Sequence, residues 1–395
     1  MAQILTKIEG ILKDKYQPAL ANQIGIEPSP FLEMIKKTPM TNNKIKYAAP
    51  YGINGGFGFG SEGLGTPKAG EQRYIDFEVE SVDMYVDIQI SNKTVALASN
   101  NVGAMINALD AEIKGSYASA KWNVGRALFG NGTGILATTK TSTAATNTVS
   151  VDRTALLIEG LTVDIYANGA AIGSTPAIAG KRILAVDRAK NTVTLEGAAV
   201  SVPAGFMTVQ NSYGRELTGL GAIYDSSIPT LYGVSKSENP YINPIVTSAE
   251  HQLTDLVLYR ALKQAKDYRG TNVNLIMMGD DAFTAYQSYM KQNGGIVIAD
   301  KHKFVGGATG YSVVIGSTEA IIVNERFVPS DEAWAVDTST FMLEQTPWEF
   351  MSQDGGIFTP LANTSIYRAL LASYGNLICT NPGGCVKITD CGVSA

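Results

Sequence analysis

The sequence predicts an α+β fold in which one long helix is combined with an α/β region and a separate region of strands. Three observations carry this prediction. Residues 99–130 place apolar side chains at helical spacing, residues 213–335 alternate between helix and strand patterns, and residues 135–212 contain strand patterns alone. The chain has 395 residues, of which 45% are hydrophobic and 17% charged, so it can fill the cores of two or three domains.

Composition and charge argue against several classes of protein. The net charge of −5 argues against a protein that binds nucleic acid on its own, because such proteins present basic surfaces. No apolar run reaches the length of a transmembrane helix, so we expect no membrane partner. The N-terminus carries charges throughout an amphipathic stretch and does not have the pattern of a signal peptide, which predicts folding in a cytoplasm. The low charged fraction predicts much surface buried against partner chains.

The first 45 residues are predicted to form an arm rather than a domain. A short amphipathic helix is followed by prolines at positions 18, 28, 30 and 39, which interrupt any continuous element. Residues 1–50 carry net positive charge, whereas the remainder of the chain is net negative. We therefore expect the arm to lie across a neighbouring copy and to contact it through Ile4, Ile8, Ile11 and Phe31. The alternative is a solvated N-terminus without fixed contacts.

Residues 46–72 combine many glycines with aromatic side chains. Eight of the 19 residues from Gly52 to Gly70 are glycine, yet Tyr51, Phe57 and Phe59 lie beside or among them. Large exposed apolar groups indicate interaction sites, so these rings are not expected in a loop that contacts only solvent. We expect residues 46–80 to form a long hairpin that inserts the rings into another subunit, with Lys68 near its tip.

Residues 73–90 alternate as a strand does, but the parity of the alternation changes once. One set of apolar residues precedes the change and a second set follows it: Ile75, Phe77 and Val79, then Val82, Met84, Val86, Ile88 and Ile90. Because a slip of one residue exchanges the two faces of a strand, we expect a bulge or bend near Ser81.

The stretch from Ser99 to Gly130 is predicted to be a helix of roughly 40 Å, far longer than average. Its apolar residues follow steps of three and four positions: Val102, Ile106, Leu109, Ile113, Tyr117, Ala120, Val124 and Leu128. Each of Gly103, Gly115 and Gly125 costs about 1 kcal/mol relative to Ala inside a helix, so we expect other backbone to pack closely against them. The helix would then be a spine across which a flat domain is laid.

Residues 135–212 are predicted to form a small all-β module inserted into the larger fold. Residues 137–151 are of low complexity and typical of a linker, and four strand-like runs follow: LTVDIYA, RILAVD, NTVTLEG and FMTVQN. Asn168-Gly169 and the segment Asp187–Asn191 are typical of hairpin turns.

Residues 213–335 are predicted to form an α/β domain. Thr247 and Glu250 have capping-box spacing at the head of a helix that Gly270 ends, and residues 273–278 have the pattern of a buried strand. The remaining predicted elements are a second helix that Asp280 caps and that runs to Asn293, then strands over 296–299, 311–316, 320–323, 340–350, 365–379 and 386–389.

No phosphate-binding or acyl-transfer motif is complete in the sequence. Gly58, Gly60 and Gly63 fit the dinucleotide pattern G-x-G-x-x-G, but further glycine and proline follow and no helix begins there. Neither a P-loop nor a G-x-S-x-G motif occurs. Ser288 and Lys291 have S-x-x-K spacing, but the partner motifs of that chemistry are missing.

The residues that could bind metal are also scattered. His251 and His302 are the two histidines of the chain, and neither has a Cys or carboxylate at ligand spacing. Cys379, Cys385 and Cys391 lie six positions apart without a C-x-x-C motif, so we expect free thiols, with a disulfide across the intervening glycine turn as the alternative.

Two further groups are predicted to be structural. The Asp280-Asp281 pair at a helix start complements the helix dipole. Four aromatic residues are predicted to lie in the core: Trp334, Trp348, Phe350 and Tyr367. We therefore predict no catalytic residue, no cofactor and no metal, and a chain that is not an enzyme.

The order of these parts resembles the major capsid proteins of tailed bacteriophages, which have the Hong Kong ninety-seven capsid fold. That order is an arm, a protruding hairpin, a bent strand, a long helix, an α/β domain and strands that return to the helix. Three stretches are similar to family segments: Asn211–Tyr224, Tyr232–Ser237 with the following Pro240–Pro244, and Asn376–Pro382. The resemblance implies an N-arm over 1–45, an E-loop over 46–80, a peripheral domain over 81–134 and 336–378, an inserted β domain over 135–212, and an axial domain over 213–335 and 379–395.

The resemblance also implies a function and partners. Such a protein self-assembles as pentamers and hexamers into the icosahedral shell around the double-stranded DNA of a tailed phage, in the bacterial host cytoplasm, and becomes part of the virion. No scaffold segment precedes the arm, so we expect a separate scaffolding protein, or a mature form, together with a portal and a decoration protein on the inserted domain. Some relatives cross-link neighbours through a lysine–asparagine bond, for which Lys68 is the candidate lysine without an identified partner.

Three alternatives stay open, one with the same fold and two from other classes of protein. An encapsulin nanocompartment shell shares the fold, but encapsulins usually lack both the long arm and the inserted β module. A hydrolase or nucleotide enzyme built on residues 213–335 is disfavoured by the missing motifs. A β-rich tail protein is disfavoured by the long helix.

Overall fold

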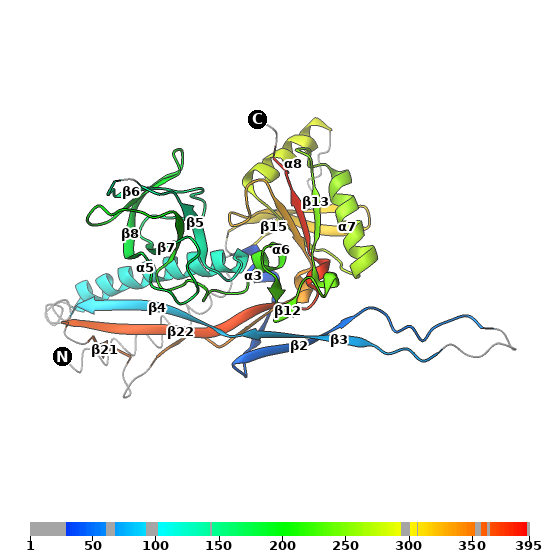
Figure 1. Ribbon diagram of the computed structural model, residues 1–395, viewed down its shortest axis with the longest axis horizontal. Coiled ribbons are helices and arrows are strands. Elements are labelled where there is room, and N and C mark those ends of the chain that lie inside the picture. Colours follow the sequence, from blue (N-terminus) through cyan, green and yellow to red (C-terminus); the bar gives the residue numbers. More distant parts are fainter. Residues whose placement is uncertain are drawn as a thin grey trace.

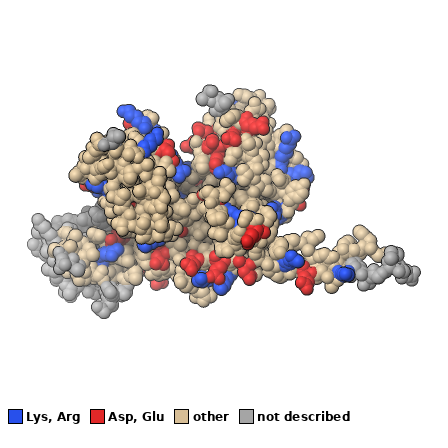
Figure 2. All heavy atoms as spheres, in the orientation of Figure 1, with Lys and Arg blue, Asp and Glu red and all other residues tan. Residues whose placement is uncertain are grey.

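A computed structural model of the chain describes residues 29–60, 68–91, 102–142, 144–293, 301–305, 307–351, 357–361 and 364–392. A long platform of strands with one long helix lying along it carries two lobes, and a hairpin extends beyond one end (Figure 1). The lobes are separated at the surface by a notch (Figure 2). The predicted mixture of helix and sheet is confirmed.

The platform sheet has the strand order β1-β19-β22-β20, and β4 and β21 also pair with β22. Its strands are β1 (Lys36–Pro39), β4 (Val82–Ser91), β19 (Phe341–Gln345), β20 (Glu349–Phe350), β21 (Thr359–Pro360) and β22 (Ile366–Cys379). β4 and β22 are antiparallel neighbours from Ser91 opposite Ile366 to Val82 opposite Gly375. Two long strands from distant parts of the sequence therefore run the length of the platform.

The predicted long helix is confirmed as α5 (Val102–Phe129), which has 28 residues. A rise of 1.5 Å per residue gives it a length of roughly 42 Å. Ile113 and Ala120 of α5 share a core with Ile88 of β4 and Leu371 of β22. The helix is thus held to the platform by one apolar face, as its periodicity predicts.

The predicted close packing against the glycines of α5 is wrong at Gly115, where an added Cβ would meet no atom within 4 Å. Close approach occurs instead at the C-terminal end of the helix, and the glycines that permit it belong to the other segment. A Cβ on Gly219 would overlap the carbonyl oxygen of Leu128, and one on Gly221 would lie 2.7 Å from that of Phe129. Only glycine fits at these two positions.

The predicted bend at Ser81 is confirmed. β3 (Arg73–Glu80) ends there and β4 begins at Val82. Phe77 of β3 packs in the central core beneath the α/β lobe, whereas Ile88 of β4 packs beneath α5. The change of parity lets one chain segment supply two cores on opposite sides of the bend.

The segment from Ser29 belongs to the body of the molecule, which corrects the expectation of an arm that ends at residue 45. Helix α3 (Pro30–Met34) buries Phe31 and Leu32 completely, and β1 pairs in parallel with β19 of the platform. The predicted helix with Ile4, Ile8 and Ile11 lies outside the described residues.

Residues 135–209 form a β barrel, called here the β lobe. Its strand order is β5-β10-β7-β8-β9-β6, and a bridge between Thr139 and Val151 joins the two ends of this order. The strands are β5 (Ile135–Thr139), β6 (Thr148–Ser150), β7 (Thr162–Ala167), β8 (Ile178–Asp187), β9 (Thr192–Leu195) and β10 (Gly205–Val209). They enclose a core of their own, which includes Leu136, Val163 and Met207.

Three predictions about the β lobe can be compared with the structure. The predicted linker over 137–151 is wrong, because Ala137 and Val149 are buried in the barrel and the segment supplies β5 and β6. The turn between β8 and β9 is confirmed, with Asn191 at a φ of 50°. Asn168-Gly169 ends β7 but opens a longer loop, since β8 begins only at Ile178.

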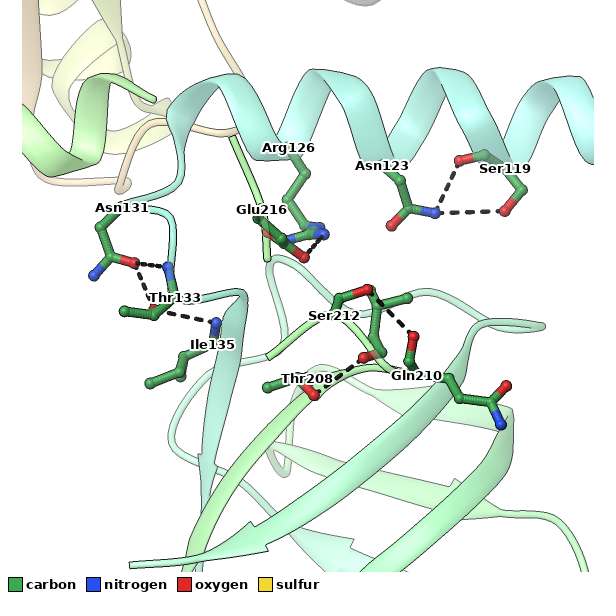
Figure 3. Close-up of polar contacts among 11 residues, drawn as sticks. Ser119, Asn123, Arg126, Asn131, Thr133, Ile135, Thr208, Gln210, Ser212 and Glu216 are labelled. Carbon is green, nitrogen blue, oxygen red and sulfur yellow. Dashed lines mark hydrogen bonds and ion pairs between the residues drawn. The ribbon is translucent and has the colours of Figure 1, made fainter. Parts of the chain in front are cut away.

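The β lobe is mounted on the C-terminal end of α5 by two adjacent connecting segments (Figure 3). They are joined by a hydrogen bond in which Gly214 N donates to Thr133 O at 2.8 Å. Arg126 of α5 donates two hydrogen bonds to the carboxylate of Glu216, at 2.8 and 2.6 Å, and the two side chains are only 4% and 7% exposed. Such a fork-to-fork pair fixes direction as well as distance.

The second lobe, called here the α/β lobe, contains a sheet of order β13-β23-β18-β14-β17-β16-β15. Its strands are β13 (Ile245–Ser248), β14 (Leu275–Met278), β15 (Lys301–Lys303), β16 (Thr309–Ile315), β17 (Thr318–Asn324), β18 (Ala333–Val336) and β23 (Val386–Thr389). Ile276 and Met278 of β14 pack with helices α7 (Asp255–Arg269) and α8 (Asp280–Gln292). Leu275 and Met277 face the central core instead. The sheet is therefore covered on both faces.

Helix caps in the α/β lobe differ in part from the prediction. The predicted capping box is wrong, because Thr247 lies in β13 and the N-cap of α7 is Thr254, whose Oγ1 accepts from Val257 N. Gly270 is confirmed as the C-terminal cap, with a φ of 63°. Asp280 is the first residue of α8 and not its cap, which is Gly279.

The shorter elements connect these parts. They are α6 (Leu220–Tyr224), β11 (Thr230–Leu231), β12 (Val234–Ser235), η3 (Pro240–Ile242), η4 (Thr338–Thr340) and η5 (Pro382–Gly384), together with β2 (Lys44–Tyr51) of the hairpin.

The burial of Phe31 gives a test of whether its segment belongs to the body. Its ring contacts those of Phe129 and Phe341 at centroid distances of 6.1 and 5.1 Å. We expect Phe31→Ala to lower the free energy of unfolding by about 3–5 kcal/mol, because the surrounding core cannot close the cavity. Urea denaturation followed by tryptophan fluorescence measures the change. A loss below about 1 kcal/mol would place the side chain outside the core.

The Arg126–Glu216 pair gives a second test. Arg126→Met leaves Glu216 buried without its partner, and we expect it to cost about 3–5 kcal/mol of stability. The double variant Arg126→Met/Glu216→Leu removes both charges and should recover most of that loss in the same denaturation experiment. A double variant no more stable than the single one would contradict the view that an unpaired buried charge is the cost.

Candidate assembly surfaces

The hairpin of β2 and β3 extends away from the rest of its own chain. The ladder runs from Lys44 opposite Glu80 to Tyr51 opposite Arg73, and the chain continues beyond it away from the body (Figure 1). Four residues of the ladder are buried, Ile45, Ala49, Phe77 and Val79. The described residues beyond the ladder, 52–60 and 68–72, are mostly exposed.

The outermost described part of the hairpin, residues 53–60 and 68–70 and called here the hairpin tip, has a defined shape despite its glycines. Asn54 Nδ2 donates to Gly70 O at 3.1 Å, and Gly56 N donates to Asn54 Oδ1 at 2.9 Å. A Cβ on Gly70 would lie 2.5 Å from Gly56 N. Any residue other than glycine at position 70 would therefore push the two sides of the hairpin apart. The glycines thus permit a tight crossing at the point where the hairpin narrows.

Two phenylalanines project from this tip. Phe57 is 80% exposed and Phe59 is 97% exposed, and their rings meet edge to face at 5.3 Å. Ile53 is 92% exposed and Lys68 is exposed nearby. A preformed apolar tip of this kind is costly in water and indicates a binding surface.

The other predicted contact residues are distributed differently. Tyr51 is half-buried and its ring stacks on that of Tyr241 at 4.5 Å, so it anchors the outer end of the β2–β3 ladder to its own chain. Phe31 is fully buried in its own chain and has no surface to offer a neighbour, which corrects its expected role. Ile4, Ile8 and Ile11 lie outside the described residues.

Charges line the base of the hairpin. Lys44 Nζ lies 2.6 Å from Glu78 and 3.3 Å from Glu80, and Lys46 Nζ lies 2.9 Å from Glu78. The two lysines lower the pKa of the Glu78 carboxyl to about 2. These pairs are exposed and add little stability. Beside them a polar groove of about 320 Å³ opens between β2 and Glu344 of β19.

A second exposed apolar set lies on the outer side of the α/β lobe. Leu256, Tyr259 and Tyr268 of α7 are 53%, 39% and 78% exposed, and Val314 of β16 is 69% exposed. Figure 2 shows basic side chains at this edge of the lobe and acidic ones gathered toward the notch. The visible face of the β lobe is largely uncharged (Figure 2).

The described residues do not bring catalytic groups together. No group of three or more His, Cys, Asp and Glu side chains among them could hold a metal ion. His251 lies in a loop at a φ of 62°, and His302 on β15 packs against Phe304. Gly58 and Gly60 belong to the hairpin tip, and Ser288 lies on α8. No helix in the described part of the chain is long and apolar enough to cross a membrane.

The cysteines and the four aromatic residues lie in cores. Cys379, Cys385 and Cys391 are free and buried, and burial raises the pKa of the Cys391 thiol to about 12. Trp334 packs in the central core, whereas Trp348 and Phe350 pack in the core beneath α5, with Tyr367 against them.

Sequence reasoning missed several buried charged residues. Lys236 Nζ donates to the carbonyl oxygens of Ala222 and Asp225, at 2.8 and 2.7 Å, and burial lowers its pKa. Glu325 and the Arg126–Glu216 pair are also buried. Their immediate sequence neighbours carry no signal of this. Glu216 lies 90 positions from Arg126 and Ser29 lies 296 positions from Glu325, and even the partners of Lys236 are 11 and 14 positions away.

Comparison with known proteins identifies the fold. No protein-family model and no curated protein sequence matches the chain. Among solved structures, a chain of the cyanophage A-1(L) capsid asymmetric unit aligns with a TM-score of 0.54 at 9% identity, over 92% of this chain and 93% of that chain.

Two further structures are similar at lower scores. They are the capsid of the empty GTA particle (TM-score 0.45, 9% identity, 93% of this chain and 90% of that chain) and the SrpI encapsulin of Synechococcus elongatus PCC 7942 (TM-score 0.44, 10% identity, 93% and 89%). With TM-scores below 0.5, these two add nothing to the first. The likeness at 9% identity is one of fold, and the chain has the fold of a phage capsid protein, as its resemblance in sequence implied.

Proposed function

We propose that this chain is the major capsid protein of a tailed bacteriophage, which assembles in many copies into the icosahedral shell around double-stranded DNA. One observation carries the proposal: the hairpin extends away from the body (Figure 1), and at its tip Phe57 and Phe59 are 80% and 97% exposed. Another copy of the chain is the partner that a subunit of a closed shell always has beside it. The capsid fold is consistent with this role.

The physical properties of the chain suit permanent contacts between copies. Its 17% of charged residues is low, and obligate interfaces are large and apolar. The hairpin tip and the exposed side of α7 are different surfaces. We propose that each contacts a different surface of a neighbouring copy, so that the contact between copies is head-to-tail. Such head-to-tail contacts close into rings, which agrees with pentamers and hexamers as the units of the shell.

The charge of the chain suits a container for DNA. With a net charge of −5, a shell of many copies repels the packaged duplex, so the genome is enclosed without being gripped. The protein is then structural and not an enzyme, needs no cofactor, and is located in the virion after assembly in the host cytoplasm.

We assign the parts of the chain by the same proposal. The hairpin over 46–80 is the E-loop, the platform with α5 is the peripheral domain, the α/β lobe is the axial domain, and the β lobe is an insertion. Ile4, Ile8 and Ile11 remain proposed arm contacts. A scaffolding protein, a portal and a decoration protein bound to the β lobe are the proposed partners. The β lobe favours a phage capsid over an encapsulin, which usually lacks such an insertion.

The hairpin tip supplies the first test of this function. Phe57→Ser/Phe59→Ser should leave the free energy of unfolding within about 0.5 kcal/mol of the parent, because both rings are solvent-exposed in the subunit. The same variant should form no closed shells when it is expressed with its neighbouring genes and viewed by negative-stain electron microscopy.

A matched control removes similar apolar surface elsewhere. Ile172→Ser/Leu184→Ser changes two residues of the β lobe that are 66% and 54% exposed, and it should assemble normally. Normal shells from the Phe57/Phe59 variant would refute the proposed contact. Shells filled with a cargo enzyme instead of DNA would favour the encapsulin alternative.

The β lobe supplies the second test. Its two connecting segments lie side by side, since a Cβ on Gly134 would lie 2.9 Å from Ser212 O. Deleting residues 135–211 and joining Gly134 to Ser212 through two glycines should leave a chain that unfolds in one cooperative transition. Circular dichroism during thermal unfolding measures this. Loss of that transition would mean that the lobe is an integral part of the fold.

A further inference from the structure

The start of helix α3 is tied to the α/β lobe by two buried side chains. Ser29 is 3% exposed and caps α3, with its Oγ accepting from Phe31 N at 3.2 Å. The same hydroxyl donates to Glu325 Oε2 at 2.8 Å. Glu325 follows β17 and is also 3% exposed. Residues 296 positions apart in sequence therefore meet in the interior.

The carboxyl of Glu325 has hydrogen bonds but no ion pair among the described residues. It accepts from the backbone N–H groups of Arg326 and Phe327 as well as from Ser29. The guanidinium carbon of Arg326 lies 3.9 Å from the ring centroid of Trp122. An ionised carboxylate here would be desolvated and incompletely compensated.

Neighbouring elements bring few other charges to this point. On α3 the carboxylate of Glu33 accepts from Val305 N at 2.7 Å and is engaged there. Burial lowers the pKa of Arg326, and the charge of Arg188 in the β8–β9 turn acts in the same direction, whereas the charge of Glu325 raises it. Burial raises the pKa of the Glu325 carboxyl to about 7, although Ser29, the two N–H groups and Arg326 act to lower it.

We propose that Ser29 and Glu325 form a protonation-sensitive latch, which holds the start of α3 to the α/β lobe most firmly when the carboxyl is neutral. Burial costs the neutral acid far less than the ionised one, and the ionised form is better solvated in any state in which the segment has opened. The latch is a property of the single chain. It therefore does not depend on the proposed role in a shell.

The direction of the pH dependence follows from proton linkage. A solvated glutamate titrates near 4.5, so an opened segment takes up fewer protons than a closed one between pH 4.5 and 7. Below that range the closed latch has its full stability. As the pH rises through the range, the equilibrium constant for closing falls by up to about tenfold per pH unit. Above about pH 7 both states are ionised, and no further change follows.

Hydrogen exchange of the full chain tests the latch. The amides of Phe31, Glu33 and Ile35 are hydrogen-bonded in or beside α3, so their exchange reports its opening. Mass spectrometry at pH 5, 6, 7 and 8, corrected for intrinsic exchange, should show opening that rises toward pH 7 and then levels. Amides of β14, in the core, should not follow this rise.

Three variants test whether the Glu325 carboxyl is the group that titrates and whether Ser29 is its partner. Glu325→Gln has the shape of the neutral acid and should remove the pH dependence. Glu33→Gln, the matched control on α3, should keep it. Ser29→Ala should raise opening at every pH. The proposal is overturned by a flat wild-type profile, by equal slopes in wild type and Glu325→Gln, by a β14 profile that matches that of α3, or by unchanged opening in Ser29→Ala.

Discussion

The C-terminal end of α5 is the point on which the rest of the structure depends. Leu128 is fully buried there, and the ring of Phe129 lies near three others, those of Phe31 at 6.1 Å, Phe327 at 5.9 Å and Trp334 at 6.0 Å. These rings come from the N-terminal segment and from the α/β lobe. Each such aromatic contact adds roughly 0.5–1.5 kcal/mol beyond the burial of area. One helix end thus joins the N-terminal segment to the α/β lobe.

The same helix end also determines where the β lobe is attached. The segment that returns from the barrel passes so close to the last turn of α5 that Gly219 and Gly221 have no room for a side chain. One turn earlier, Arg126 holds Glu216 of that segment. A crowded backbone crossing and a buried ion pair together fix the direction in which an otherwise self-contained barrel leaves the body.

The hairpin differs from the end of α5 in that its apolar side chains are exposed. The body of the molecule buries most of its described apolar side chains, apart from the exposed set on α7 and β16, whereas the hairpin tip keeps Phe57 and Phe59 in water. The close approach of Gly56 and Gly70 gives that tip its shape. A tip that is ordered before it meets a partner loses less conformational entropy on binding. The structure therefore combines a tightly packed body with an exposed apolar tip, which is the contact surface that we propose for a second copy.

The sequence by itself determined the elements whose signals are local. The helical spacing over α5, the change of parity at Ser81 and the left-handed cap at Gly270 all appear in short windows, because each depends on residues within a few positions. The exposed rings of the hairpin tip were also predictable, since glycine-rich context offers no core to bury them. Tertiary structure alone decided that Phe31 lies inside its own chain, that residues 137–151 complete a barrel, and that Glu325, Lys236 and Arg126 are buried. The physical reason is that periodicity reports which face of an element is apolar, whereas the segments that cover that face lie far away along the chain and leave no mark in the local pattern.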